Sequence, residues 1–200
     1  MKKYLILVLI VLLIGALTVG VLAGKGKTGQ AGKSNIAHLY LYQKTYVDPN
    51  VGDYLDVDGG AWGKMKYNLA GETFDFVFNG HGLVPGDDYT LIYYPDPWPG
   101  TGLICLGSGI VNDEGNIHIA DSVDTGVDLP ILGDLNADTA TTTLEDGSTG
   151  AKIFLVPTSD VGCFTQEMVG WTGPWSGNID GENIYLFEDE LIYFDDVDVP

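Results

Sequence analysis

Short apolar or alternating runs recur along the chain after residue 35, and residues that favour turns separate them. In TFDFVF (73–78), Phe74, Phe76 and Phe78 occupy every second position, which is the period of a strand with one buried side. Gly, Pro, Asn and Asp lie between the runs, as in loops that join strands. The runs are HLYLYQ (38–43), WGKMKYN (62–68), TFDFVFN (73–79), YTLIYY (89–94), GLICLGSGIV (102–111), NIHIA (116–120), AKIFLVP (151–157) and NIYLFEDELIYF (183–194).

This pattern predicts an all-β fold. No segment after residue 35 has a helical period of useful length. About eight short strands joined by turn residues are typical of a β-sandwich or a small barrel. We expect a Greek-key β-sandwich of immunoglobulin-like or jelly-roll type, formed as a single domain by residues 36–200.

The N-terminus has the composition of an export signal. Two lysines precede an apolar run from Tyr4 to Ala23, and Val21 and Ala23 have the spacing that a signal peptidase prefers. Residues 1–23 are therefore expected to be a signal peptide, and the alternative is an uncleaved signal anchor, because the run is long enough to span a bilayer. Residues 24–35 are rich in Gly and Lys and predict a flexible linker. Either alternative places the domain outside the cytoplasm, secreted or at the cell surface.

The exported part is strongly acidic. All 28 acidic residues lie at or after Asp48, where only Lys64, Lys66 and Lys152 oppose them, which gives that segment a formal net charge of −25. Affinity for phosphate backbones comes from Lys and Arg, so this composition argues against nucleic acid and anionic lipid as partners. Two interpretations of the acidic residues stay open: they form a solubilising shell, or they form specific cation sites.

Cys105 and Cys163 are the only cysteines. In an oxidising compartment such a pair predicts a disulfide, and neither cysteine has a Cys or His neighbour at metal-ligand spacing. Closing the loop would stabilise the fold by about 4 kcal/mol through the entropy of the unfolded chain.

One turn resembles a known structural motif. GLVPGDDYTL (82–91) is similar to the GLxPGxxYxV corner of fibronectin type III and related immunoglobulin-like domains, with matches at Leu83, Pro85, Gly86 and Tyr89. The resemblance implies a tyrosine corner, in which the tyrosine hydroxyl bonds to the backbone where the chain crosses between sheets. It implies topology and no function.

A wider resemblance covers most of residues 36–190. The blocks HLYLYQK, GAWGKM, FDFVFNGHGL, YTLIYYPDPWPGTGLICLGSG, GNIHI and GAKIFLVP look like those of a group of secreted, uncharacterised proteins of methanogenic archaea. The resemblance implies export and a common fold, and it implies no activity.

Two proline-containing loops hold tryptophans. YYPDPWPGTG (93–102) contains Trp98, and GWTGPWSGN (170–178) contains Trp171 and Trp175. Proline fixes φ and removes an N–H donor, so these segments are expected to leave the sheet as stiff loops. The tryptophans either plug the open ends of the sandwich or form a rigid aromatic platform for a sugar ring or another protein.

An acidic segment matches the oxygen positions of an EF-hand calcium loop. In DLNADTATTTLE (134–145), positions one, three, five, nine and twelve are Asp134, Asn136, Asp138, Thr142 and Glu145. Thr139 occupies position six, where the loop needs glycine, so the alternatives are a calcium loop of looser geometry and a solvated acidic loop. Ca²⁺ is the only candidate cofactor.

Three weaker signals concern metals and catalysis. DYLDVDGG (53–60), with Asp53, Asp56 and Asp58, is a less specific acidic segment. His38, His81 and His118 lie in separate segments, either as isolated polar residues or as a metal site spread over three strands. Ser108 lacks the GxSxG spacing of a nucleophile elbow, so no catalytic residue is predicted and an enzyme is not favoured.

These observations favour an exported, non-enzymatic module for cell-surface or extracellular-matrix contacts, with Ca²⁺ assisting. One alternative is a lectin-like carbohydrate-binding module that uses the loop tryptophans. Another is a fibre or sheath subunit that assembles by strand exchange. The expected partners are an extracellular protein, a glycan or further copies of the chain.

Overall fold

The computed structural model describes residues 34–48, 53–134, 150–172, 183–188 and 191–198. The predicted signal peptide and residues 24–33 of the predicted linker lie outside these ranges. Among the described residues, no helix has the length and apolar character needed to cross a membrane.

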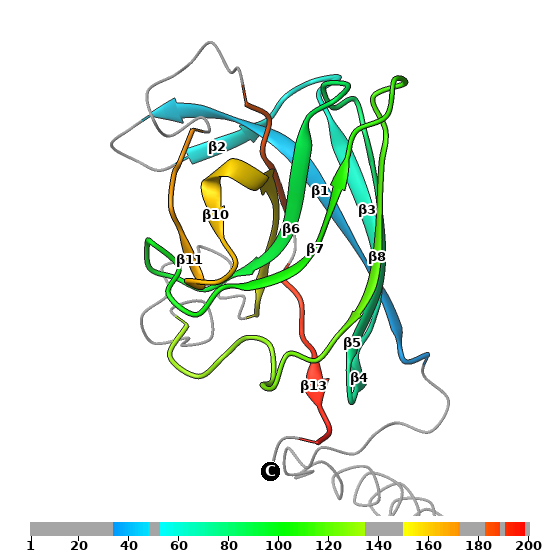
Figure 1. Cartoon of the computed structure of the whole chain (residues 1–200), viewed down its shortest axis with the longest axis vertical. Helices are drawn as coiled ribbons and strands as arrows, with labels where there is room; N and C mark the ends of the chain where they lie inside the picture. The colour runs from blue at the N-terminus through cyan, green and yellow to red at the C-terminus, as the bar shows by residue number, and fades with distance from the viewer. Residues whose placement is uncertain (1–33, 49–52, 135–149, 173–182, 189–190, 199–200) are drawn as a thin grey trace, which may run out of the picture. The chain divides into compact units, whose positions relative to one another are not determined.

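The described chain is built of strands, so the all-β prediction is confirmed (Figure 1). Most strands coincide with the runs predicted from the sequence. Their bounds are β1 Ile36–Asp48, β2 Asp53–Asp56, β3 Trp62–Asn68, β4 Ala70–Gly71, β5 Phe74–His81, β6 Asp88–Tyr94, β7 Ile104–Ile110, β8 Ile117–Val123, β9 Lys152–Pro157, β10 Val161–Gly162, β11 Glu167–Met168, β12 Leu186–Glu188 and β13 Asp195–Asp196. One 3₁₀ turn, η1, spans Thr158–Asp160.

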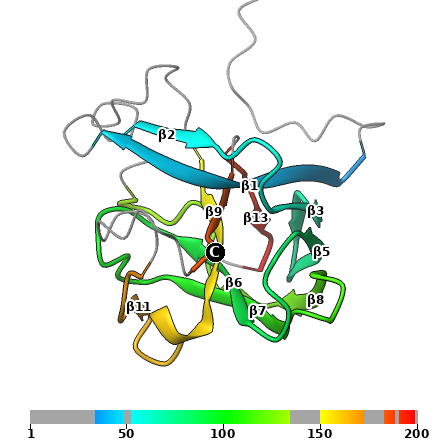
Figure 2. The same ribbon diagram turned by 90° about the horizontal axis from the view of Figure 1, so that it is seen from above.

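Eight strands form one antiparallel sheet in the order β7-β6-β9-β12-β1-β3-β5-β8, and β2 pairs with β1. Seen from above, the sheet curls around a common core, so that its end strands β7 and β8 approach each other (Figure 2). The fold is therefore a nearly closed barrel, and the predicted two-sheet sandwich is not confirmed. The strand runs themselves do not distinguish two facing sheets from one curled sheet, because both bury one face of each strand.

The β7–β8 seam closes through side-chain packing, because these two strands are the unpaired ends of the described ladder. A Cβ added to Gly107 would lie 2.8 Å from a methyl group of Ile119, and one added to Gly109 would lie 3.3 Å from Ile117. The isoleucines of β8 thus occupy the space that side chains on β7 would fill.

The barrel interior is apolar. Phe74, Phe76 and Phe78 of β5 all point inward and are buried, as their alternation predicts. They pack with Leu39 and Leu41 of β1 and with other inward residues of the sheet. This core is continuous around the inside of the barrel, so accessible surfaces lie on the loops and on those outer faces that no segment covers.

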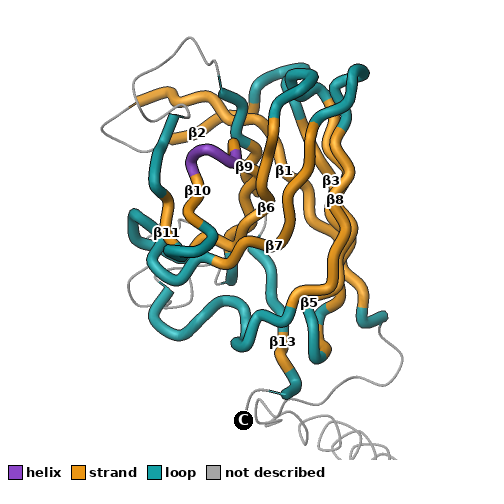
Figure 3. Tube along the Cα trace, viewed as in Figure 1, coloured by secondary structure: helices purple, strands orange, loops and turns teal. Residues whose placement is uncertain are grey.

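A second apolar layer lies outside the barrel, on β6, β9 and β12. The outward residues of these strands are Ile92, Tyr94, Phe154, Val156 and Phe187, and they are buried together with Tyr185, which directly precedes β12. They are covered by the segment 158–172, which contains η1, β10 and β11, together with Leu103 (Figure 3). The predicted disulfide is confirmed: Cys105 of β7 is bonded to Cys163 of this segment, with their Cα atoms 5.7 Å apart. It ties the covering segment to the barrel wall.

The segment with the sequence of a tyrosine corner forms the turn between β5 and β6. Gly86 has φ +90°, which favours glycine, and its N–H donates to the Val111 carbonyl at 3.0 Å. Leu83 is buried and Pro85 is exposed in the same turn. Tyr89 is buried, but its hydroxyl has no hydrogen-bond partner among the described residues. The corner's hydrogen bond stays a prediction.

Candidate functional site

The loop after β6, residues 95–103, holds Trp98 and packs against β11. Met168 N–H donates to the Pro99 carbonyl at 2.9 Å, and Gly102 N–H donates to the Gln166 carbonyl at 2.9 Å. The Asp96–Pro97 and Trp98–Pro99 peptide bonds are cis. Backbone bonds to β11 and fixed proline φ angles hold the loop in one conformation, in line with the stiffness expected from its prolines.

Gly100 allows this loop to close on the barrel. Its φ is +74°, and a Cβ at this position would clash with the ring of Tyr94. Gly100 N–H donates to the Pro97 carbonyl at 2.9 Å, which completes a tight turn around Trp98. A side chain at residue 100 would therefore displace the loop from Tyr94.

Trp98 and Trp171 form an aromatic pair, the tryptophan site, at the margin of the outer apolar layer. Their ring centroids are 5.3 Å apart and their planes meet at 85°, an edge-to-face contact. Trp171 is half-buried and also contacts Tyr94 and Tyr185, with centroid distances of 6.1 and 5.4 Å. Trp98 is 54% exposed. Trp171 thus covers the apolar layer, whereas Trp98 packs against Trp171 and faces solvent.

A buried carboxylate, Asp160 in η1, fixes the backbone around Trp171. Asp160 is 2% exposed and accepts hydrogen bonds from Thr172 N–H at 2.8 Å, from Thr172 Oγ1 at 2.6 Å and from the Tyr185 hydroxyl. Its carbonyl accepts from Val169 N–H at 2.9 Å. Burial, and then the hydrogen bond to Asp160, raise the pKa of Tyr185 above its ordinary value.

Sequence reasoning missed Asp160. The available signal was a single acidic residue directly after the apolar run of β9, in TSD. Its burial depends on the covering segment folding back over the sheet, which local pattern does not reveal. The third predicted tryptophan, Trp175, lies outside the described residues.

The first residue of the predicted calcium loop, Asp134, has a structural role. It is 1% exposed and accepts hydrogen bonds from the Tyr93 hydroxyl at 2.6 Å and from Asp96 N–H at 3.1 Å. The other predicted ligands, Asn136, Asp138, Thr142 and Glu145, lie outside the described ranges. Within those ranges, no group of three or more His, Cys, Asp or Glu side chains could hold a metal ion. A calcium loop therefore stays a prediction.

The weaker acidic segment is placed by β2 and the turn after it. Asp56 forms an ion pair with Lys44 at 2.5 Å, and Asp58 is exposed. Asp53 begins β2 and pairs with Asp48 in the ladder. Ion pairing of Asp56 favours a local structural role for this segment.

The three histidines lie on different strands or at their ends, and each is accounted for separately. His81 Nδ1 bonds to Asn116 Oδ1 at 2.7 Å, and its ring packs against Trp62 at 4.8 Å. His118 Nδ1 bonds to Asn79 Oδ1 at 2.8 Å, and His38 is exposed on β1. Two of the three histidines therefore have amide partners.

No family model, curated protein or solved structure matches this chain. The function is therefore inferred from the site itself.

Proposed function

We propose that the protein is an exported, non-enzymatic binding module that makes cell-surface contacts by holding a sugar ring against Trp98. The observation that carries this proposal is the position of Trp98, which is more than half exposed yet held by the loop and by Trp171. A tryptophan offers a large rigid contact face at little entropic cost, and exposed anchors of this kind dominate binding energies.

The surroundings of Trp98 suit an uncharged glycan. Thr101, three residues further along the loop, donates its hydroxyl to Glu167 Oε1 at 2.9 Å. Glu167 belongs to β11, which the Trp98 loop contacts through Met168 N–H and the Pro99 carbonyl. A hydroxyl and a carboxylate on these two elements would supply hydrogen bonds to sugar hydroxyls, while the indole takes the C–H face of the ring. The proposed cell-surface location rests on the predicted export signal. The proposed assistance by Ca²⁺ rests on the acidic segment 134–145.

The test is binding of the purified protein to an array of neutral glycans, followed by titration of the glycans that bind. We expect Trp98→Ala to weaken Kd by roughly 30-fold, equivalent to the loss of about 2 kcal/mol from an aromatic anchor. Trp62→Ala is the matched control, because Trp62 is an exposed tryptophan on β3 outside the tryptophan site. Unchanged binding by Trp98→Ala would overturn the proposal, as would the absence of binding to every neutral glycan.

A further inference from the structure

The outer face of β1, β3, β5 and β8 carries basic, aromatic and amide side chains in register. In one row, Tyr40 pairs with Lys64, Lys64 with Asn79 and Asn79 with His118. In the next row, His38 pairs with Lys66 and Lys66 with Val77. Residues that face each other in an antiparallel ladder point to the same side of the sheet. We define the basic face by six of these residues: His38, Tyr40, Lys64, Lys66, Asn79 and His118.

Among the described residues, Lys64 and Lys66 carry positive charge without an ion pair. Of the four lysines after residue 35, Lys44 pairs with Asp56 and Lys152 pairs with Asp96. In the described parts of the chain, no carboxylate lies within 4.0 Å of Lys64 or Lys66. In a segment with 28 acidic residues, these two ammonium groups share one face and one strand, and Asp75 is the carboxylate on the same face of β5.

Lys64, Asn79 and His118 are held in place before any ligand arrives. Lys64 Nζ lies 5.3 Å from the centroid of the Tyr40 ring, and that ring stacks on Tyr42 with centroids 6.4 Å apart. The cation–π contact holds the lysine over the sheet. The bond between His118 and Asn79 orients both polar side chains on the neighbouring strands. Ordering costs on binding are therefore reduced.

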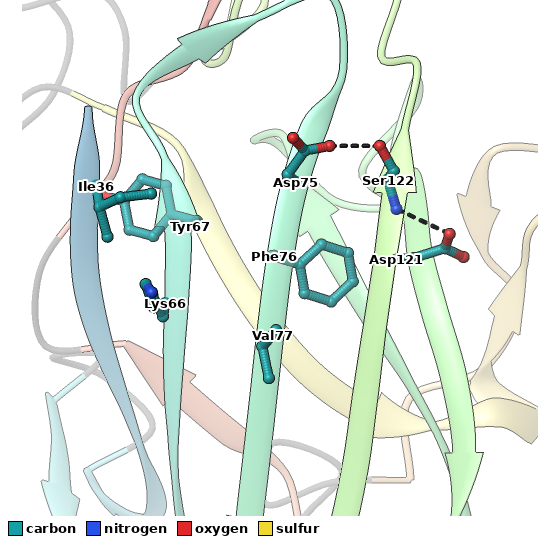
Figure 4. A pocket seen from close by; sticks show the side chains of 8 residues that line it. All are labelled: Ile36, Lys66, Tyr67, Asp75, Phe76, Val77, Asp121 and Ser122. Atoms are coloured by element: carbon teal, nitrogen blue, oxygen red, sulfur yellow. Dashed lines mark hydrogen bonds between the residues drawn. The ribbon is translucent and has the colours of Figure 1, made fainter.

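A hollow of about 460 Å³ adjoins Lys66 on this face (Figure 4). Lys66 and Val77 lie at one end, and Asp75, Asp121 and Ser122 lie at the other. Ser122 and Thr73 donate hydroxyl hydrogen bonds to Asp75 Oδ1. An acidic sugar can direct its carboxylate to the lysine end, its C–H groups to Val77 and its hydroxyls to the Asp75 end.

We infer that the basic face binds an extended carboxylated polysaccharide, with acidic sugars on Lys64 and Lys66. These lysines are two residues apart on one strand, so their Cα atoms lie about 7 Å apart. Two cations suit a polymer with one charge per sugar better than DNA, which carries one charge per roughly 1.7 Å of helix axis. The net charge of −25 on residues 48–200 repels densely charged polyanions most strongly. At physiological salt, charges more than about 8 Å from the ligand are largely screened, whereas Lys64 and Lys66 would contact the ligand directly and act unscreened. The site and its ligand class are independent of the tryptophan site.

The experiment is affinity electrophoresis of the purified protein through gels containing polygalacturonate at physiological ionic strength, with dextran gels as the uncharged control. Each lost charge-assisted contact is worth about tenfold in Kd, so Lys64→Gln and Lys66→Gln should each weaken binding by about tenfold and the double variant by about 100-fold. Lys152→Gln is the matched control, because it removes the same charge from an ion-paired lysine on β9, outside the basic face, and should leave retardation unchanged. Binding should be lost in about 1 M salt, where the screening length is about 3 Å.

Three outcomes would overturn the inference: no retardation of the wild type by polygalacturonate, equal retardation of the double variant, or equal retardation in dextran. Sedimentation tests whether the basic face binds a second copy of the chain instead. Self-association of the wild type that the double lysine variant abolishes would assign the face to that second copy. Trp98→Ala should still bind polygalacturonate, and the double lysine variant should still bind a neutral glycan. Failure of either site is thereby distinguishable from failure of the other.

Discussion

Trp98 meets Trp171 edge to face, with the ring centroids 5.3 Å apart and the planes at 85°. One ring covers apolar residues on the outside of the barrel and the other faces solvent. The two tryptophans therefore have different roles, and substituting each in turn distinguishes those roles.

Trp171→Ala is expected to lower the free energy of unfolding by about 2 kcal/mol, because it uncovers Tyr94 and Tyr185. Trp98→Ala should cost less than about 1 kcal/mol, because most of the Trp98 surface is already in water. Urea unfolding of the two variants measures both values. An equal loss in the two variants would mean that Trp98 is a structural residue.

Removing the Asp160 carboxylate is expected to destabilise the covering segment more than removing one of its donors. Asp160→Ala leaves Thr172 and Tyr185 without their acceptor and should cost about 3 kcal/mol, whereas Tyr185→Phe removes one hydrogen bond and should cost about 1 kcal/mol. Thermal unfolding gives the order, and the fluorescence of Trp171 reports the local change. A smaller cost for Asp160→Ala than for Tyr185→Phe would contradict the positioning role.

Loss of the disulfide is expected to loosen the covering segment first. Cys105 and Cys163 are 58 residues apart, so Cys105→Ser with Cys163→Ser should cost about 4 kcal/mol in the loop-entropy account. Limited proteolysis should then cut within residues 158–172 before the barrel strands. First cleavage in β3 or β5 would contradict this order.

Stability is expected to fall at alkaline pH. Burial, and then the nearby charge of Asp87, raise the pKa of Tyr89 from 10.0 to about 12, and burial also raises the pKa of Tyr93, Tyr94 and Tyr185. Below pH 10 these groups are protonated in both folded and unfolded chains, and their contribution is fully present. As pH rises above 10, the unfolded chain loses protons that the folded chain keeps, so the free energy of unfolding falls with pH until the folded-state pKa values are passed.

Ultraviolet absorbance of the phenolate groups checks this expectation. The four buried tyrosines should ionise together with unfolding. Tyr89→Phe should reduce the loss of stability between pH 10 and 12. Ionisation of the four buried tyrosines without unfolding would refute the assignment.

Substitution of Asp134 distinguishes stability that comes from its hydrogen bonds from stability that comes from bound calcium. Because it accepts hydrogen bonds from Tyr93 and Asp96, Asp134→Ala should cost about 2–3 kcal/mol even when calcium is removed with a chelator. Calcium bound by the folded state would raise the unfolding temperature of the wild type further, by mass action. Magnesium at equal concentration is the control for ionic strength, and no cost of Asp134→Ala in chelator would contradict the structural role.

Local pattern predicted the features that depend on neighbouring residues. The alternation of Phe74, Phe76 and Phe78 identified the inner face of β5, and the presence of two cysteines in a chain with a predicted export signal identified the disulfide. The run YTLIYY (89–94) predicted a strand, and the structure buries both faces of that strand. What covers its outer face is the segment 158–172, about 65 residues further along the chain, and no short-range pattern encodes that contact.

The same limit applies to strand order and to the two sites. One curled sheet differs from a sandwich only in which distant strands pair, such as β6 with β9 and β12 with β1. Trp98 was predicted to be a stiffly held residue, but its exposure and its contact with Trp171 depend on the covering segment. The rows of the basic face depend on the register of four strands, which a shift of one residue would abolish.

The seam between β7 and β8 has a consequence for motion. Gly107 and Gly109 pack against isoleucines without ladder bonds to β8, so this line is held by dispersion and apolar burial while β3 is bonded on both sides. Separating the two strands by a few ångströms breaks no backbone pairing of the sheet. The barrel therefore has a built-in line of local opening, at which the amides along the facing edges of β7 and β8 exchange their protons with solvent sooner than those of β3.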